Sequence, residues 1–308
     1  METMESGARA QRVGVRYEVP VGHDGWELRE ETMPESVTHD RAVELLKALL
    51  AAWAANAGAD ANANADANAN AGANANAGAN ANAHANAGAD ATAGADATAG
   101  AHANANAAAS APAFVARNLA VRWDPSRPSI GVDPDVSVFT PAPPGSDALR
   151  SVRTWLPGHT APLVAIEVVS EGDPRKDYVT APDKYAASGT RELWIFDPLL
   201  AGPTSHGGPF RIQVWRRTAG SDFMRVYAGD GPARSEALGA YLVATGEGQL
   251  LRIADDEAAT RPWLTAEEAE RAAREAEHAE KEAERAQKEA ALARVAELEA
   301  WLSRAGQE

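Results

Sequence analysis

Two carboxylates and two lysines stand where they could carry out a hydrolytic reaction. Asp135 opens a short apolar run, and Glu167 lies in the middle of a longer one. A carboxylate at the centre of an apolar strand is costly to bury unless a cation compensates its charge. Lys176 and Lys184 follow on the next segment. We therefore expect the two lysines to reach the sheet edge that holds the carboxylates.

Such a group suits the hydrolysis of a phosphodiester with the help of a divalent metal. Carboxylate oxygens hold Mg²⁺, the ion polarises the phosphate and lowers the pKa of a bound water, and an ammonium group orients that water or offsets developing charge. A structural role is the alternative. Asp135 could cap a turn after Pro134, and Glu167 could pair with a buried arginine. The spacing alone leaves both interpretations open.

Other polar residues rank lower as site candidates. Glu35 and His39 stand near the start of the first predicted helix, where a helix-start role is favoured over a third carboxylate or a phosphate contact. Asp197 precedes Pro198 at the end of a predicted strand, so we expect it to be a turn residue.

The large aromatic residues are expected to form core rather than a platform for stacking bases. They are Trp155, Tyr185, Trp194 and Trp215. The sequence contains no phosphate-cradling glycine loop, no Ser-His-Asp order and no dinucleotide fingerprint. These absences remove several enzyme classes from consideration.

The elements that would position the carboxylates are strand-like runs separated by turn signals. The first helix is predicted over Asp40–Trp53, with a start at Ser36 or Thr38, and a second over Asp177–Ser188, ended by Gly189. Strands are predicted over Phe114–Val121, Asp135–Phe139, Leu163–Val169, Glu192–Phe196, Phe210–Arg216 and Phe223–Ala228. This order predicts an α/β or α+β domain with a mixed sheet flanked by helices.

Two segments have a composition unlike the rest. From 57 to 113 every odd position is Ala, with Asn, Gly, Asp, Thr or His between, and this pattern predicts a disordered insertion. From about Thr265 the chain is rich in Ala, Glu, Arg and Lys, with small residues at coiled-coil spacing, and this predicts a helical tail. The predicted layout is a flexible 1–24, a first helix region 25–55, an insertion 56–112, a core 113–262 and a tail 263–308.

Composition excludes further classes. The 308 residues include no cysteine, so thiolate zinc sites, cysteine nucleophiles and disulfides are ruled out and a cytoplasmic location is expected. Neither a signal peptide nor a membrane-spanning segment is expected. The net charge is −15, yet residues 113–262 hold 16 basic and 18 acidic residues, so the central region does not forbid a polyanionic substrate.

The ordered set of motifs resembles the Uma-two family of bacterial endonucleases, part of the restriction-endonuclease-like PD-(D/E)xK superfamily. The motifs are Asp133-Pro134-Asp135-Val136, Ile166-Glu167-Val168-Val169-Ser170, Lys184-Tyr185-Ala186 with Gly189, and Glu192-Leu193-Trp194-Ile195-Phe196-Asp197-Pro198. The resemblance covers about 25–55 and 113–260. It implies a restriction-endonuclease-like core that binds Mg²⁺ or Mn²⁺ through Asp135 and Glu167 and cleaves DNA.

The lysine departs from the pattern. The position two after the glutamate, where the superfamily signature has lysine, is Val169, and Ala181 stands where relatives carry a lysine from the following helix. Lys184 comes three residues later, about one helical turn, so it could occupy a similar volume, with Lys176 in reserve.

The sequence thus predicts a metal-dependent DNA endonuclease with Asp135, Glu167 and Lys184 as catalytic residues. The competing hypothesis is a weak or inactive nuclease fold that binds a partner, or a second copy, through its tail. A purely structural oligomer is the third. Basic residues gathered on the face of Asp135 would favour the nuclease: Arg117, Arg122, Arg150, Arg153, Arg175 and Lys176.

Overall fold

The computed structural model describes residues 12–13, 26–28, 36–56, 112–218 and 222–305. Two compact units make up the chain, Met1–Trp263 and Leu264–Glu308, and each is treated by itself. The predicted insertion and the predicted flexible start lie almost wholly outside the described residues, so the predicted layout of the whole chain stays a prediction.

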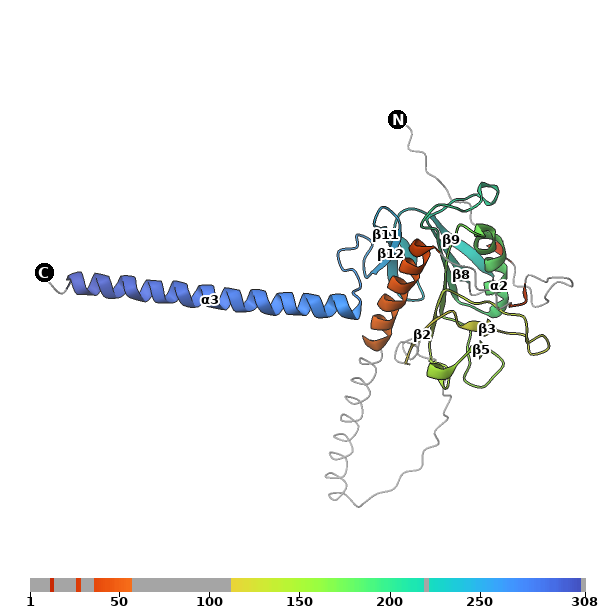
Figure 1. Ribbon diagram of the computed structural model, residues 1–308, viewed down its shortest axis with the longest axis horizontal. Helices are drawn as coiled ribbons and strands as arrows, with labels where there is room; N and C mark the ends of the chain where they lie inside the picture. Colours follow the sequence, from red (N-terminus) through yellow and green to blue (C-terminus); the bar gives the residue numbers. More distant parts are fainter. Residues whose placement is uncertain (1–11, 14–25, 29–35, 57–111, 219–221, 306–308) are drawn as a thin grey trace, which may run out of the picture. The chain divides into compact units, whose positions relative to one another are not determined.

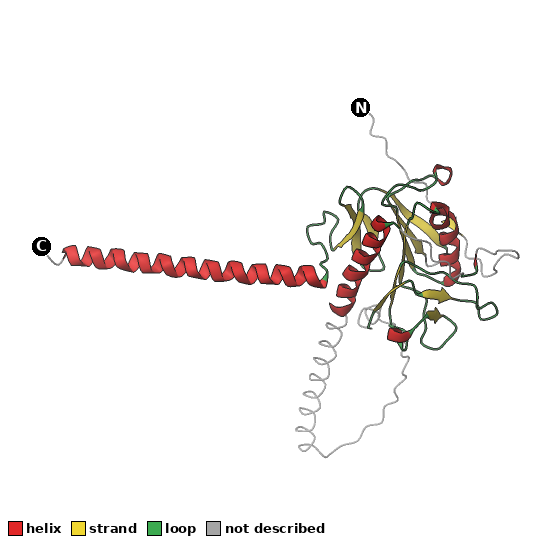
Figure 2. Ribbon diagram, viewed as in Figure 1, coloured by secondary structure: helices red, strands yellow, loops and turns green. Residues whose placement is uncertain are grey.

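A mixed seven-stranded sheet forms the centre of the first unit (Figures 1 and 2). Its strand order is β1-β9-β8-β7-β6-β4-β2. β6 and β7 are parallel and every other neighbouring pair is antiparallel. The strands are β1 (Arg12–Val13), β2 (Phe114–Arg117), β4 (Val136–Phe139), β6 (Val164–Val168), β7 (Glu192–Phe196), β8 (Ile212–Arg217) and β9 (Phe223–Gly229). The prediction of a mixed α/β fold is confirmed.

Strand alternation divides the core of this sheet between its two faces. On one face, Val164 and Ile166 of β6 pack with the helix over 37–56. On the other, Ala165 of β6 packs in a second cluster with Tyr185 and Ala186 of the helix α2 (Ala181–Ser188). Glu167 follows the alternation onto the α2 face.

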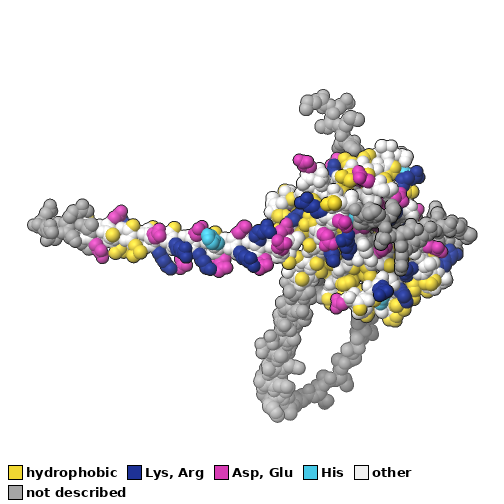
Figure 3. All heavy atoms as spheres, in the orientation of Figure 1, with side chains coloured by type: hydrophobic (Ala, Val, Ile, Leu, Met, Phe, Trp, Pro, Cys, Tyr) yellow, Lys and Arg dark blue, Asp and Glu magenta, His cyan; other side chains and the backbone are white. Residues whose placement is uncertain are grey.

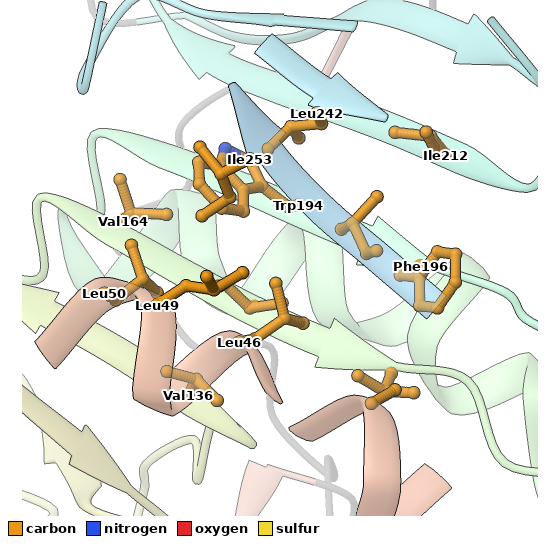
Figure 4. Packing of buried hydrophobic residues seen from close by; sticks show 14 of the residues in the cluster. Leu46, Leu49, Leu50, Val136, Val164, Trp194, Phe196, Ile212, Leu242 and Ile253 are labelled. Atoms are coloured by element: carbon orange, nitrogen blue, oxygen red, sulfur yellow. The ribbon is translucent and has the colours of Figure 1, made fainter. Parts of the chain in front are cut away.

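The helix over 37–56 begins as the sequence predicts. Ser36 Oγ accepts a hydrogen bond from the backbone N–H of His39 at 3.2 Å, which caps the helix. The predicted apolar face is buried, with Leu46, Leu49 and Leu50 fully inside. Figure 4 shows these leucines packed against strand residues of the sheet.

The segment before α2 differs from prediction. Instead of one continuous α-helix over Asp177–Ser188, the chain forms a π-helical turn, η4 (Lys176–Thr180), which then continues into α2. The wider turn buries the side chains of Asp177 and Tyr178. Gly189 ends α2 with φ +86°, in the left-handed region that glycine enters at no steric cost, as predicted.

The prediction of a single strand over Phe114–Val121 is wrong. The chain turns at Asn118, where φ is +51°, and this separates β2 from β3 (Ala120–Arg122). Asn tolerates this conformation better than most residues because its short side chain can bond the local backbone. β3 pairs in parallel with β5 (Ser151–Arg153), a strand the sequence did not reveal.

A second sheet of three antiparallel strands covers part of the helix-bearing face. It comprises β10 (Ala233–Ser235), β11 (Ala240–Thr245) and β12 (Leu250–Ala254), and Leu242 and Ile253 join the same core as the first helix (Figure 4). The strands had not been predicted. Residues 246–248, with all three φ angles positive, form the turn between β11 and β12, a signal that could have revealed this hairpin.

The second unit is the helix α3 (Ala266–Ala305). Thr265 and Glu268 form a reciprocal cap, with Glu268 N–H donating to Thr265 Oγ1 at 3.2 Å and Thr265 N–H donating to Glu268 Oε2 at 2.9 Å. Acidic and basic side chains alternate along its length (Figure 3) and form pairs four residues apart, such as Glu277 with Lys281. Among the described helices none is both long and apolar enough to cross a membrane.

Candidate active site

The strand register brings Asp135 and Glu167 together. β4 pairs with β6 so that Val136 lies opposite Ile166 and Ser137 opposite Ala165. Continuing this antiparallel register by one residue places Asp135 opposite Glu167. Both residues are buried, at 8% and 1% relative exposure. The two acidic residues thus lie at facing positions of neighbouring interior strands.

Asp135 is held by two donors. The backbone N–H of Val168 donates to Asp135 Oδ2 at 2.7 Å, and His39 Nε2 lies 3.2 Å from the same oxygen. His39 is buried, and it precedes Asp135 by 96 residues in the sequence. His39 does belong to the helix start, since its N–H donates to the Ser36 cap, and its imidazole in addition contacts the Asp135 carboxylate.

Glu167 has one satisfied and one unsatisfied oxygen. The hydroxyl of Tyr185 donates to Oε1 at 2.7 Å, whereas Oε2 is buried with no hydrogen-bond partner in the described structure. Burial raises the pKa of Glu167 to about 7, opposed by the charge of Lys176 and assisted by that of Asp135. A buried carboxylate oxygen without a partner is unusual in a native fold and marks a site that a cation or proton would complete.

Both predicted lysines lie within electrostatic reach of Glu167. Lys184 on α2 is half-buried, and burial lowers its pKa while the Glu167 carboxylate raises it. Lys176 is exposed, with its Nζ 3.9 Å from Asp177 Oδ1, and it is the cation that most lowers the pKa of Glu167. Lys184 therefore lies close enough to interact with the Glu167 carboxylate, although it is one helical turn beyond Ala181.

A further buried acid, Asp177, belongs to the same group and had not been singled out. Desolvation raises its pKa well above the usual value, and the nearby charges of Glu167 and Asp135 raise it further. No sequence pattern at Asp177, eight residues before Tyr185, indicates that its side chain is buried at the site. Only the π-helical turn, which buries Asp177, makes it part of the site.

Among the described residues, Glu167 does not form the buried ion pair with an arginine that was the structural alternative. The buried glutamate that pairs with an arginine is Glu192, whose Oε2 lies 3.1 Å from Arg216 Nε. Glu192 also accepts a hydrogen bond from Trp194 Nε1 at 2.7 Å. Glu167 has the Tyr185 hydroxyl instead.

The donor set fits a hard divalent cation. Mg²⁺ keeps several water ligands and is held through one or two carboxylates. Asp135 and Glu167 supply two, with Glu167 Oε2 open. Within the described ranges, no three His, Asp or Glu side chains gather as a ready-made metal cluster.

Two other predictions concern residues beside the site. Asp197 is a turn residue as expected, accepting hydrogen bonds from the backbone N–H groups of Ala201 and Gly202 and from the Tyr178 hydroxyl. Glu35 lies outside the described residues. Of the aromatic residues expected in the core, Tyr185, Trp194 and Trp215 are buried.

Trp155 does not belong to that core, which corrects the expectation. It is half-buried and lines a hollow together with Arg122, Arg150 and Arg153. Trp155 follows β5 in a turn, where it has no sheet face to pack against.

The predicted gathering of basic residues on the face of Asp135 stays a prediction, since Asp135 is not among the residues that line the hollow. Three of the six arginines and lysines named from the sequence line this hollow. Arg117 is engaged elsewhere, bonded to Asp40 at 2.6 Å and to Glu44 on the first helix.

The fold is a mixed α/β domain with two buried carboxylates on neighbouring strands. Comparison with known families agrees: residues 95–206 match the Uma2 family model, described as "Putative restriction endonuclease". This stretch contains Asp135, Glu167 and Lys184. The resemblance of this region to the Uma2 family, which the sequence motifs indicate, is thus confirmed.

Among solved structures, the chain is similar to "a putative nuclease belonging to DUF820" from Anabaena variabilis. The two share 17% identity with a TM-score of 0.28, over 41% of this chain and 61% of the other. The match therefore spans less than two thirds of that protein. No curated protein matches the sequence.

Proposed function

We propose that this protein is a Mg²⁺- or Mn²⁺-dependent DNA endonuclease. The observation that carries the proposal is the pair of opposed carboxylates, Asp135 and Glu167, in which Glu167 Oε2 is buried without a partner. The match of residues 95–206 to a family described as "Putative restriction endonuclease" supports it. The cysteine-free composition supports the cytoplasm as the place of action.

The protein orients both carboxylates before any ligand arrives. Val168 N–H and His39 fix Asp135 through Oδ2, and Tyr185 fixes Glu167 through Oε1. Each carboxylate therefore keeps lone pairs for a metal ion. A divalent ion bound there would polarise the phosphate and lower the pKa of a water nucleophile.

Lys184 is proposed to orient the attacking water or to offset the charge that develops on the phosphate. Its half-buried ammonium group is screened less by solvent than an exposed one would be, so its charge acts more strongly. Lys176 is the reserve for this role, since it is exposed and lies beside Asp177.

The test is plasmid nicking combined with calorimetric titration of Mg²⁺ and Mn²⁺. Wild type should nick and bind the ion, whereas Asp135→Asn/Glu167→Gln should lose both, with nicking reduced by more than ~100-fold. The matched control Asp147→Asn/Glu257→Gln removes the same charge from exposed positions and should behave as wild type. A wild type that neither binds the ion nor nicks would refute the proposal.

Single lysine variants complete this experiment. Lys184→Met should slow nicking by about 100-fold, the usual cost of losing one group that stabilises developing charge. Lys176→Met should cost less than ~10-fold, because the exposed ammonium is screened by solvent. The reverse order would move the role to Lys176.

A nuclease fold that acts through binding is the second candidate function. It rests on α3, where Leu292, Val295 and Leu298 are exposed on one face of the helix. Such a stripe could hold a second copy of the chain or another helix. If the nicking test fails while this stripe mediates association, the binding function is favoured.

A further inference from the structure

A hollow of about 690 Å³ has Asp133, two residues before Asp135, in its wall. Three arginines and a tryptophan contribute to its wall: Arg122, Arg150, Arg153 and Trp155. Its volume is in the range of pockets that hold small ligands. Neither the family match nor the carboxylate chemistry assigns a role to it.

The arginines are placed side by side although their charges repel. Arg122 of β3 is the register partner of Arg153 of β5, so the two side chains leave the same side of this small sheet. Like charges directly opposite each other in a sheet are destabilising. An anion bound between them would remove that cost.

Most of the positive charge in the hollow is available to a ligand. Arg122 donates to the carbonyl of Pro128, which orients its guanidinium group. Arg150 and Arg153 are exposed, and among the described residues no side-chain hydrogen bond or ion pair engages either guanidinium group. Asp133 lines the same wall, leaving a positive excess.

The hollow adjoins the carboxylates through the backbone. Asn118, which also lines it, donates its backbone N–H to the carbonyl of Pro134 at 3.2 Å, and Pro134 precedes Asp135. In addition, the charge of Asp133 raises the pKa of Glu167. The wall of the hollow is therefore continuous, through the backbone, with the strand end that carries Asp135.

The shape and the lining of the hollow favour a single nucleotide as its ligand over the surface of a DNA duplex. Arginine forks match phosphate oxygens, and a tryptophan ring offers a face on which any base can stack. A duplex presents its phosphates on a convex surface and keeps its bases inside. A hollow with an aromatic wall instead suits a nucleotide that lies outside a double helix.

We propose that this hollow binds a nucleotide from a single-stranded or unpaired DNA segment, with phosphate on Arg122, Arg150 and Arg153 and base on Trp155. The inference rests on the proposed nuclease function in taking DNA as the ligand. It adds that the substrate contains an unpaired stretch.

The test is fluorescence anisotropy in EDTA with a labelled single-stranded oligodeoxynucleotide and with its blunt duplex. Wild type should bind the single strand more tightly. Arg122→Gln/Arg150→Gln/Arg153→Gln should weaken that binding by about 100-fold and reduce the slope of log affinity against log salt by about 2. The control Arg271→Gln/Arg274→Gln/Arg285→Gln removes the same charge from α3 and should change neither quantity.

Two further variants separate folding from binding. Arg150→Gln/Arg153→Gln alters only exposed side chains and should still weaken single-strand binding by more than ~10-fold with an unchanged thermal midpoint. Trp155→Leu should weaken single-strand binding by about 10-fold and leave duplex binding nearly unchanged. Equal losses for both DNA forms would show that the hollow does not select an unpaired nucleotide.

The outcomes distinguish this inference from the proposed function. If the arginine variants bind the single strand as wild type does, the inference is wrong even when nicking occurs. If wild type binds through the arginines but never nicks, the nuclease proposal fails and the binding site stands. Asp135→Asn/Glu167→Gln should retain single-strand binding in EDTA, because it leaves the hollow intact.

Discussion

Glu167 occupies a position that an inert protein would fill with an apolar residue. It stands in β6 between Ile166 and Val168, both buried, and has one oxygen without a hydrogen bond. The Tyr185 hydroxyl satisfies the other oxygen. Such an arrangement costs stability in the absence of a ligand, which is typical of residues kept for chemistry rather than for packing.

The raised pKa of Glu167 gives the metal-free protein a predictable pH dependence. The folded state holds a proton up to about pH 7, whereas the unfolded chain releases it near 4.5. The folded state therefore binds more protons in this window, so the free energy of unfolding falls as pH rises from 4.5 to 7, by about 3 kcal/mol. Urea unfolding in EDTA at several pH values measures this loss.

Glu167→Gln should remove much of that pH dependence, because the amide does not titrate and can still accept from Tyr185. Glu257→Gln, at an exposed position, is the control and should keep the wild-type profile. A Glu167→Gln variant that loses as much stability between these pH values as wild type would show that Glu167 does not titrate there.

Among the elements, the helix over 37–56 brings to the site a residue that is distant from it in the sequence. It carries His39 to Asp135 while Leu46, Leu49 and Leu50 pack on the opposite sheet face from α2. The site is thus formed where the first helix, β4, β6 and α2 meet. Packing of the leucines sets the position of the imidazole.

Leu46→Ala tests that contribution. Leu46 is fully buried, so the lost contacts and the cavity left behind should lower the free energy of unfolding by about 2–5 kcal/mol. Val37→Ala on the same helix is the control, since Val37 is 86% exposed and should change stability by less than about 0.5 kcal/mol. Thermal or urea unfolding measures both. A Leu46→Ala variant as stable as wild type would mean that the helix is not packed on the sheet.

At the scale of the whole molecule, the chain joins an α/β unit with a buried core to a long helix whose side chains are exposed. α3 has no buried residue along its described length after residue 266, and its large apolar side chains gather near its end. They are Leu292, Val295, Leu298 and Trp301. Leu292, Val295 and Leu298 share one face of the helix, and such an exposed apolar stripe favours burial against another helix.

We expect this stripe to hold two copies of the chain together. Sedimentation velocity should show a dimer that dissociates on dilution, and Leu292→Glu/Val295→Glu/Leu298→Glu should give a monomer at all concentrations because like charges would meet in the interface. The control Ala266→Glu/Ala273→Glu/Gln287→Glu adds the same charge away from the stripe and should remain dimeric. A monomeric wild type would contradict the expectation.

The sequence by itself determined the elements whose patterns are local. The apolar face of the first helix, its Ser36 cap, the Gly189 stop and the central strands β4, β6 and β7 all follow from spacing and residue type. The same patterns singled out Asp135 and Glu167, because a charge in an apolar strand is conspicuous. Family resemblance then supplied the expectation of a nuclease.

Only the tertiary structure decided which residues meet around those carboxylates. His39 reaches Asp135 across 96 positions of sequence, and Asp177 is buried by a π-helical turn that no periodicity announces. Arg122 and Arg153 become neighbours because β3 pairs with β5, two three-residue strands too short to recognise. These contacts depend on long-range pairing, whereas sequence patterns report only the preferences of nearby residues.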